Sequence, residues 1–316
     1  MLSRLRERPS VATVRRVALA ALIANVGIVV SGGAVRLTGS GLGCPTWPQC
    51  TDDSFVSTPE MGLHGAIEFG NRLLTWLLLA IVVACVTAVL RQRPRRRPLV
   101  RLSLALLVGI FAQAALGGVT VLTGLHPLTV AAHFLLSMAL VAVAVLLHER
   151  SGGTDVAPVP TVGPPLTLAA WLLVVLTAAV LVLGTVVTGA GPHSGDIAAT
   201  ERLPFDPTTV TRVHAALVLL LLGMVAGVLL ALSATRAPSV VRSRAVAFAV
   251  LVLIQGAVGT AQYLTGLPEL LVGLHLLGAA LVWVAVLRLL LSTRDRSRHI
   301  EPPTVSTPRP ATSARS

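Results

Sequence analysis

Histidines stand at matching places in two apolar stretches of the chain, and an imidazole can ligate a metal or carry a proton. The stretch from Gln113 to His133 recurs from Gln255 to His275 with a constant shift of 142 residues and no gap. Each copy has a Gln four residues before a Gly, then a Thr-Gly-Leu turn, then a His inside the next apolar segment. Because ionisable residues within membrane-type segments are rare and usually functional, the repeat predicts two equivalent sites, one in each half.

Two further polar residues match these histidines in depth. Asn71 and His214 are 143 residues apart, and each lies near the start of its own apolar segment, as His133 and His275 do. In spanning helices all four would lie roughly 6 to 11 Å below one membrane surface, at ~1.5 Å of rise per residue. Facing histidines from two helices can supply both axial ligands of a haem iron, whereas zinc requires more ligands than each half offers. The shared depth of these residues therefore predicts a haem held by His214 and His275.

Arginines near the same surface are candidates for binding the propionate groups of a haem. A guanidinium binds a carboxylate through two parallel hydrogen bonds. The predicted propionate-binding residues are Arg36, Arg72 and Arg212.

Glu68 lies near the same end of an apolar segment, where an unpaired carboxylate is costly. Arg72 follows it by four residues and can pair with it across one helical turn, which is the structural reading. The catalytic reading depends on what this face of the predicted helix meets, and Asn71 and His64 share the face. The residues alone leave both readings open.

Two of the three cysteines, Cys44 and Cys50, lie in the loop that follows the first apolar segment. Pro45 and Pro48 bend the chain between them, and the compartment outside a cytoplasmic membrane permits oxidation, so a disulfide is expected. The pair is either a structural disulfide or a redox-active one, and a free thiol pair or a metal site is the remaining alternative. Cys85 lies within an apolar segment and is expected in the core.

The composition places these residues in a membrane protein. Of 316 residues, 54% are hydrophobic and only 12% are charged, with a mean hydropathy of +0.83. Apolar runs long enough to cross a ~30 Å hydrocarbon layer predict eight spanning helices. The sequence thus predicts an all-α membrane protein whose eight transmembrane helices form two pseudo-symmetric four-helix bundles. The predicted spans are 17–35, 67–90, 99–122, 127–148, 166–188, 209–232, 244–265 and 268–292.

The net charge of +12 comes from arginines that cluster in alternate loops. By the positive-inside rule, these loops and both termini are cytoplasmic, in a multi-pass protein of the cell membrane. Charge beside a span is usually a topology signal, so nucleic acid is not an expected partner and the lipid bilayer is. The clusters are Arg4 to Arg16, Arg91 to Arg101, Arg236 to Arg244 and Arg294 to Arg298.

The repeat and a Gly- and Pro-rich stretch divide the chain. We expect an N-terminal half over residues 1–150, a cytoplasmic linker over 151–165 and a C-terminal half over 166–296. The polar segment 297–316 is expected to be a disordered cytoplasmic tail.

Several motifs together resemble those of the haem A synthases, integral membrane enzymes that convert haem O to haem A for terminal oxidases. The likeness extends over all eight predicted spans. The motifs are the loop Leu37 to Cys50, the segment Ile67-Glu68-Phe69-Gly70-Asn71-Arg72, the helices around His133, His214 and His275, and the loop Thr188 to His193.

The resemblance implies a haem b in the C-terminal half and the substrate haem O in the N-terminal half, with His133 at the substrate iron. It implies successive hydroxylations of one porphyrin methyl, the doubly hydroxylated carbon losing water to give a formyl group. Glu68 matches the carboxylate implicated in catalysis, and Cys44 with Cys50 matches the loop pair. The implied partners are a haem O synthase as donor and an electron acceptor or a thiol–disulfide partner, and a homo-oligomer is compatible with this reading.

The chain departs from the family pattern at two places. Many members have His where this chain has Asn71, which leaves His133 alone, Asn71 with a water, or His64 as substrate-side options. The loop from Ser194 to Pro207 has no cysteine pair, so any thiol chemistry must use Cys44 and Cys50.

Two other classes of protein remain as rivals. A membrane cytochrome b that only transfers electrons would use the same histidines. A transporter of two parallel repeats would line its path with Asn25, Gln113 and Gln255, although the spans carry few acidic residues.

Overall fold

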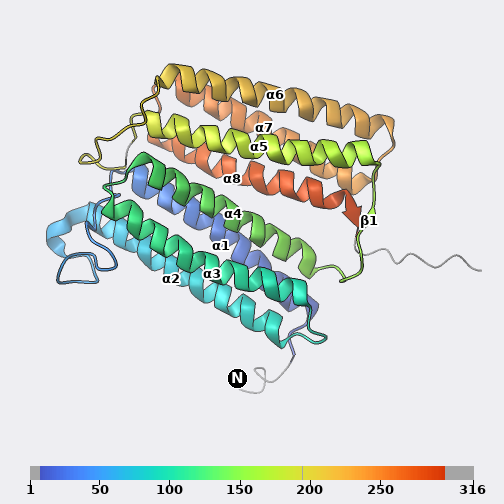
Figure 1. The fold of residues 1–316 in the computed structure, drawn as a ribbon, viewed down its shortest axis with the longest axis horizontal. Helices are drawn as coiled ribbons and strands as arrows, with labels where there is room; N and C mark the ends of the chain where they lie inside the picture. The colour runs from blue at the N-terminus through green and yellow to red at the C-terminus, as the bar shows by residue number, and fades with distance from the viewer. Residues whose placement is uncertain (1–7, 194, 296–316) are drawn as a thin grey trace, which may run out of the picture.

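Eight long helices make up most of the computed structural model, which describes residues 8–193 and 195–295 (Figure 1). All eight are long and apolar enough to span a membrane, so the predicted all-α, multi-pass membrane protein is confirmed. The helices are α1 (Val11–Leu37), α2 (Gly62–Arg91), α3 (Arg97–Leu122), α4 (Pro127–Ser151), α5 (Pro164–Ala190), α6 (Pro207–Ala234), α7 (Ser239–Leu264) and α8 (Glu269–Ser292). A short helix, η1 (Pro59–Met61), precedes α2.

Six of the eight helices begin earlier than the hydrophobic runs predicted, whereas α4 begins at the predicted residue 127 and α8 begins at 269 instead of 268. The first begins at Val11 instead of residue 17, because the Ser10 side chain caps it by accepting a hydrogen bond from the Thr13 N–H at 3.1 Å. Proline occupies the first position of α4, α5 and α6, where its missing N–H costs nothing. The polar residues of a first helical turn are helical but do not raise the local hydropathy. The hydrophobic runs therefore underestimated the length of these helices.

The repeated Thr-Gly-Leu turn has the same backbone in both copies. Gly124 and Gly266 adopt left-handed φ angles of 61° and 79° after α3 and α7. The next residue, Leu125 or Leu267, donates its N–H back to the carbonyl five residues earlier, at 2.9 and 2.7 Å. This is the Schellman C-cap, for which glycine is favoured because it lacks a Cβ. The turn reverses the chain, so that α4 runs back along α3 and α8 runs back along α7.

The helices pack as two rings of four. Within each half, every helix contacts its neighbours in sequence, and the last helix contacts the first. The halves meet through α1, α4, α5 and α8, and α8 lies against α4 in the middle of the molecule (Figure 1). There the Trp283 indole N–H donates to the Met138 carbonyl at 2.9 Å. This arrangement is compatible with two related bundles.

The predicted linker contains a short strand that the sequence did not indicate. Strand β1 (Val159–Pro160) pairs antiparallel with β2 (Arg294–Asp295), which follows α8. Thr161 reinforces the pairing through its N–H to the Thr293 carbonyl at 2.9 Å. The expected disordered tail, 297–316, lies outside the described residues.

Each half has its own apolar core. One cluster of buried residues is built mainly from α1 to α4, and the other from α5 to α8. Cys85 is buried in the first cluster, as predicted. The cores hold the helices rigidly, so polar side chains near the helix ends keep fixed positions.

Candidate functional site

The repeated histidines are tied to the neighbouring helix in the same way in both halves. Gln113 on α3 donates from its side-chain amide to the His133 backbone carbonyl at 2.8 Å. Gln255 on α7 donates to the His275 carbonyl at 2.7 Å. These bonds fix the depth of each histidine relative to the preceding helix, which explains why the glutamine recurs in the repeat.

Glycines stand directly beside the imidazole rings. A Cβ added at Gly117 would lie 3.1 Å from Cε1 of His133, and one at Gly259 would lie 3.0 Å from Cε1 of His275. His214 has a comparable neighbour in Gly184, at 3.5 Å. A Cβ at Gly117 or Gly259 would press on the ring, whereas one at Gly184 would make an ordinary van der Waals contact. The sequence showed that Gly117 and Gly259 recur, but this close approach became evident only from the packing.

The same three rings have nitrogens without a protein partner. Nδ1 of His133, His214 and His275 is buried and makes no hydrogen bond within the described residues. A buried polar atom left unpaired costs about 1–3 kcal/mol, which favours an additional group at these rings. Two half-buried imidazoles from facing helices, with room kept by glycine, fit the axial ligands of a haem.

The first half differs at the position that matches His214 in the sequence. Asn71 accepts a hydrogen bond through its Oδ1 from the Ser31 hydroxyl on α1, at 2.8 Å. His64 is exposed, and its Nδ1 lies 2.9 Å from the hydroxyl of the buried Ser40. His64 therefore belongs with the loop that follows α1. Which of these residues faces a substrate iron stays a prediction.

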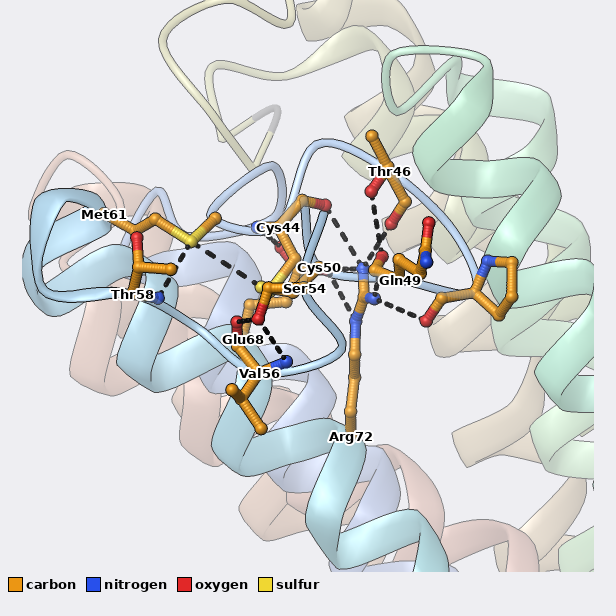
Figure 2. Close-up of a disulfide and its surroundings, with 11 residues drawn as sticks. Cys44, Thr46, Gln49, Cys50, Ser54, Val56, Thr58, Met61, Glu68 and Arg72 are labelled. Atoms are coloured by element: carbon orange, nitrogen blue, oxygen red, sulfur yellow. Dashed lines mark hydrogen bonds and ion pairs between the residues drawn. A yellow bond between two sulfur atoms is a disulfide. The ribbon is translucent and has the colours of Figure 1, made fainter. Parts of the chain in front are cut away.

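Glu68 lies beneath the loop of residues 38–58, called here the Cys44 loop (Figure 2). Its side chain is buried, and both carboxylate oxygens have partners. Oε2 accepts the Cys44 N–H at 2.6 Å, and Oε1 accepts Nη2 of Arg72 at 2.7 Å. The predicted pairing across one helical turn is confirmed. The bond to the Cys44 backbone was not predicted, because it joins segments 24 residues apart.

Arg72 holds the Cys44 loop over the start of α2. Its guanidinium donates to the carbonyls of Cys44, Thr46 and Gln49 at 3.1, 3.0 and 3.0 Å. Figure 2 shows the guanidinium among these carbonyls. Each of its three nitrogens is engaged by the loop or by Glu68. The predicted binding of a propionate by Arg72 would compete with these contacts.

Cys44 and Cys50 form the predicted disulfide, with both residues fully buried. The Cys50 sulfur lies 3.7 Å from the Met61 sulfur of η1. Between the cysteines, Trp47 packs on Gly118 of α3, where a Cβ would come within 2.4 Å of the indole. The disulfide, Trp47 and Arg72 therefore fix the loop at three points, and the loop presents a backbone N–H to Glu68.

The other predicted arginines have different surroundings. Arg36, at the end of α1, donates through Nε to the His193 carbonyl at 2.8 Å and through Nη2 to the Thr188 carbonyl at 3.2 Å. It thus joins the first half to the loop after α5. Gly41 strengthens that junction by donating its N–H to the Gly195 carbonyl at 2.8 Å. Arg212 is exposed at the start of α6.

The comparisons with known proteins agree on one family. A family model described as a cytochrome oxidase assembly protein (COX15-CtaA) matches residues 15–194, which is more than half of the chain. A protein of Symbiobacterium thermophilum named "Heme A synthase" is 33% identical over 186 residues, covering 56% of this chain and 60% of that protein. One of Alkalihalophilus pseudofirmus with the same name is 29% identical over 137 residues, covering 42% and 46%.

A third protein named "Heme A synthase", from Bacillus pumilus, is 34% identical over 125 residues, covering 38% of this chain and 39% of that protein. The chain thus spans about half the length of the curated relatives it matches. The residues matched by the family model include the Cys44 loop, Glu68, Asn71 and His133. His214 and His275 lie beyond them.

Proposed function

The chain belongs to the cytochrome oxidase assembly family, and from that premise we propose that it is a haem A synthase, an oxidoreductase that converts haem O to haem A for assembly of terminal oxidases. The single observation that carries the proposal is the repeated histidine unit. In each half a Gln sets the depth of a His, and a Gly leaves room beside its ring. A protein with two such units can hold two haems of different roles.

In this proposal the second half holds a resident haem b through His214 and His275. Their paired depth, glycine neighbours and unpartnered nitrogens support that assignment. A low-spin iron with two imidazole ligands supplies one-electron transfer when bound. The protein keeps the imidazoles in a fixed, water-poor place between α5–α6 and α7–α8.

The first half is proposed to receive haem O beneath the Cys44 loop, with His133 toward the iron. Conversion of a methyl to a formyl group adds one water oxygen and releases four protons and four electrons. Successive hydroxylations of that methyl, followed by loss of water, would satisfy this balance. The electrons pass to an acceptor or to a thiol–disulfide partner. Cys44 and Cys50 are the candidate redox pair of this chain, and because both are buried the Cys44 loop must open for a partner to reach them.

Glu68 is proposed to serve this reaction by balancing positive charge at the methyl carbon or by accepting its protons. Its location supports this role, because the carboxylate is buried between the Cys44 N–H and Arg72 at the loop end of α2. These two partners orient the carboxylate, and burial excludes water from it.

We further propose that the protein lies in the cell membrane with both termini cytoplasmic, and that a haem O synthase delivers the substrate. Arginine clusters at one end of the helices support that orientation. The Cys44 loop then faces the oxidising side, consistent with its disulfide.

Pigment analysis tests the proposal. Membranes of a host that makes haem O but no haem A are prepared with and without the protein, and the extracted haems are separated chromatographically. Haem A should appear only with the protein and should be lost in His133→Ala. If haem O stays unchanged while a b-type spectrum forms, the chain is an electron-transferring cytochrome b.

A further inference from the structure

A surface cavity of about 450 Å³, largely open to the surroundings, lies between α7 and α8 at the end of the molecule opposite the Cys44 loop. Arginines gather at this end, called here the arginine end, where α7 begins and α8 finishes (Figure 1). The proposed haem sites do not use this cavity. Its main lining residues are Ser239, Ser243, Arg244, Ala247, Ala285 and Arg288.

The two arginines are held in place by one acidic residue from the other half. Glu149 on α4 accepts Arg244 Nη2 and Arg288 Nε, each at 2.7 Å. Arg244 also donates through Nη1 to the Arg288 carbonyl at 2.7 Å. One carboxylate between two guanidiniums leaves one positive charge in excess. The group that would complete this cluster is a single negative charge.

Hydrogen-bond donors face the cavity without partners. Arg288 is 46% exposed at its side chain, and its Nη groups form no hydrogen bond within the described part of the chain. Helix α7 starts after Pro238 with no side-chain cap, so the N–H groups of Ser239 and Val240 precede the first bond of the helix, from Val241. The positive end of the helix dipole adds to the two guanidiniums. The Ser239 and Ser243 hydroxyls supply further donors.

We propose that this cavity binds a phosphate group, and that its source is the phosphodiester of an anionic phospholipid. A phosphodiester carries the single negative charge that the cluster lacks, and its oxygens accept from a guanidinium fork. Arg288 lies four residues before the end of α8, about 6 Å along the helix, which is the depth of lipid headgroups. The small residues Ser243, Ala247 and Ala285 leave a groove from the arginines toward the apolar layer, where an acyl chain can lie.

The repeat supplies an internal comparison. Under the shift of 142 residues that aligns the histidine units, Arg244 and Arg288 correspond to Leu102 and Leu146 in the first half. The pair α3–α4 packs with leucine instead of arginine at both positions. The arginine pair is therefore not required for packing of the repeated helices. Instead it pairs with Glu149 of the other half, and the Nη groups of Arg288 are left for a ligand.

Native mass spectrometry and thermal unfolding of the purified full-length protein test the proposal, with short-chain phosphatidylglycerol, phosphatidylcholine and inorganic phosphate as probes. Wild-type protein should bind phosphatidylglycerol more tightly than phosphatidylcholine and be stabilised by it. Arg288→Ala should weaken the binding of phosphatidylglycerol by about fivefold, which is the effect of one arginine at a membrane surface. Ser243→Leu should weaken it too, because leucine fills the cavity without changing any charge.

Arg242→Ala is the matched control, since Arg242 is an exposed arginine on the same turn of α7 and does not line the cavity. It should bind phosphatidylglycerol as the wild type does. Equal losses in Arg242→Ala and Arg288→Ala, or no loss in Ser243→Leu, would overturn the site in favour of general surface attraction. Stabilisation by inorganic phosphate alone would support the phosphate site and overturn the lipid source.

Discussion

The two halves share a histidine unit and differ in what surrounds it. In both, a Gln on the third helix of the bundle bonds the carbonyl of the His on the fourth, and a Gly lies beside the ring. The second half adds His214 at the matching depth, whereas the first half has Asn71 bonded to Ser31. Only the first half has a disulfide-closed loop over a buried carboxylate. The same histidine unit thus has different surroundings in the two halves.

This difference corresponds to the two roles in the proposed function. A resident cofactor should stay bound, and two imidazoles from facing helices favour that. A substrate must enter, react and leave, so a single firm ligand and a nearby carboxylate suit it better. The comparison predicts that exchanging features between the halves should change haem retention and turnover separately.

The largest expected effect comes from removing the paired ligand of the second half. His275→Ala should abolish the low-spin b-type spectrum of the purified protein and reduce its bound haem b to background, because His275 is the histidine proposed to pair with His214. Haem content per chain and the reduced-minus-oxidised spectrum measure this. His126→Ala, which changes the half-exposed histidine that caps α4 in the first half, is the control and should keep the spectrum. An intact bis-His spectrum in His275→Ala would contradict the assignment of haem b.

Next is Glu68→Gln, which tests the carboxylate of the first half. The amide can still accept the Cys44 N–H, but it cannot accept a proton or balance a positive charge. Haem A formation should fall by about 10²- to 10⁴-fold, while the second-half haem b spectrum stays unchanged. Arg72 keeps its loop carbonyls, so the Tm should fall by no more than about 4 °C. Substantial haem A production would show that Glu68 serves only to pair Arg72.

These residues also show what the sequence could predict. Period and hydropathy predicted the eight helices, the i,i+4 pair of Glu68 and Arg72, and the short-range disulfide, because each depends on neighbours in the chain. The repeat predicted the histidine units. The reach of Arg36 to the His193 carbonyl was not predictable, because it joins segments 157 residues apart. Periodicity assigns a residue to a face of a helix but does not specify which loop packs above it.

A smaller effect should follow from making the first half more like the second. Asn71→His is expected to add an imidazole opposite His133, to increase low-spin haem per chain in protein supplied with haem O, and to slow haem release. Turnover should fall several-fold because the substrate dissociates more slowly. Ser31→Ala is the control, since it removes the hydrogen bond to Asn71 without adding a ligand. If both variants had the same spectrum, Asn71 would not be at the substrate site.

The smallest expected effect is that of Gly259→Ala, which tests the space beside His275. The added Cβ would lie 3.0 Å from Cε1, so the ring or α7 must move by a few tenths of an ångström. We expect haem b to dissociate a few-fold faster and its reduction potential to shift, with the fold retained, because alanine favours a helix more than glycine does. Gly256→Ala, on the same helix with no atom within 4 Å of the new Cβ, is the matched control and should behave as the wild type. Faster dissociation in both variants would point to a general change in α7, whereas a change in Gly259→Ala alone would support a haem held through the ring that this glycine accommodates.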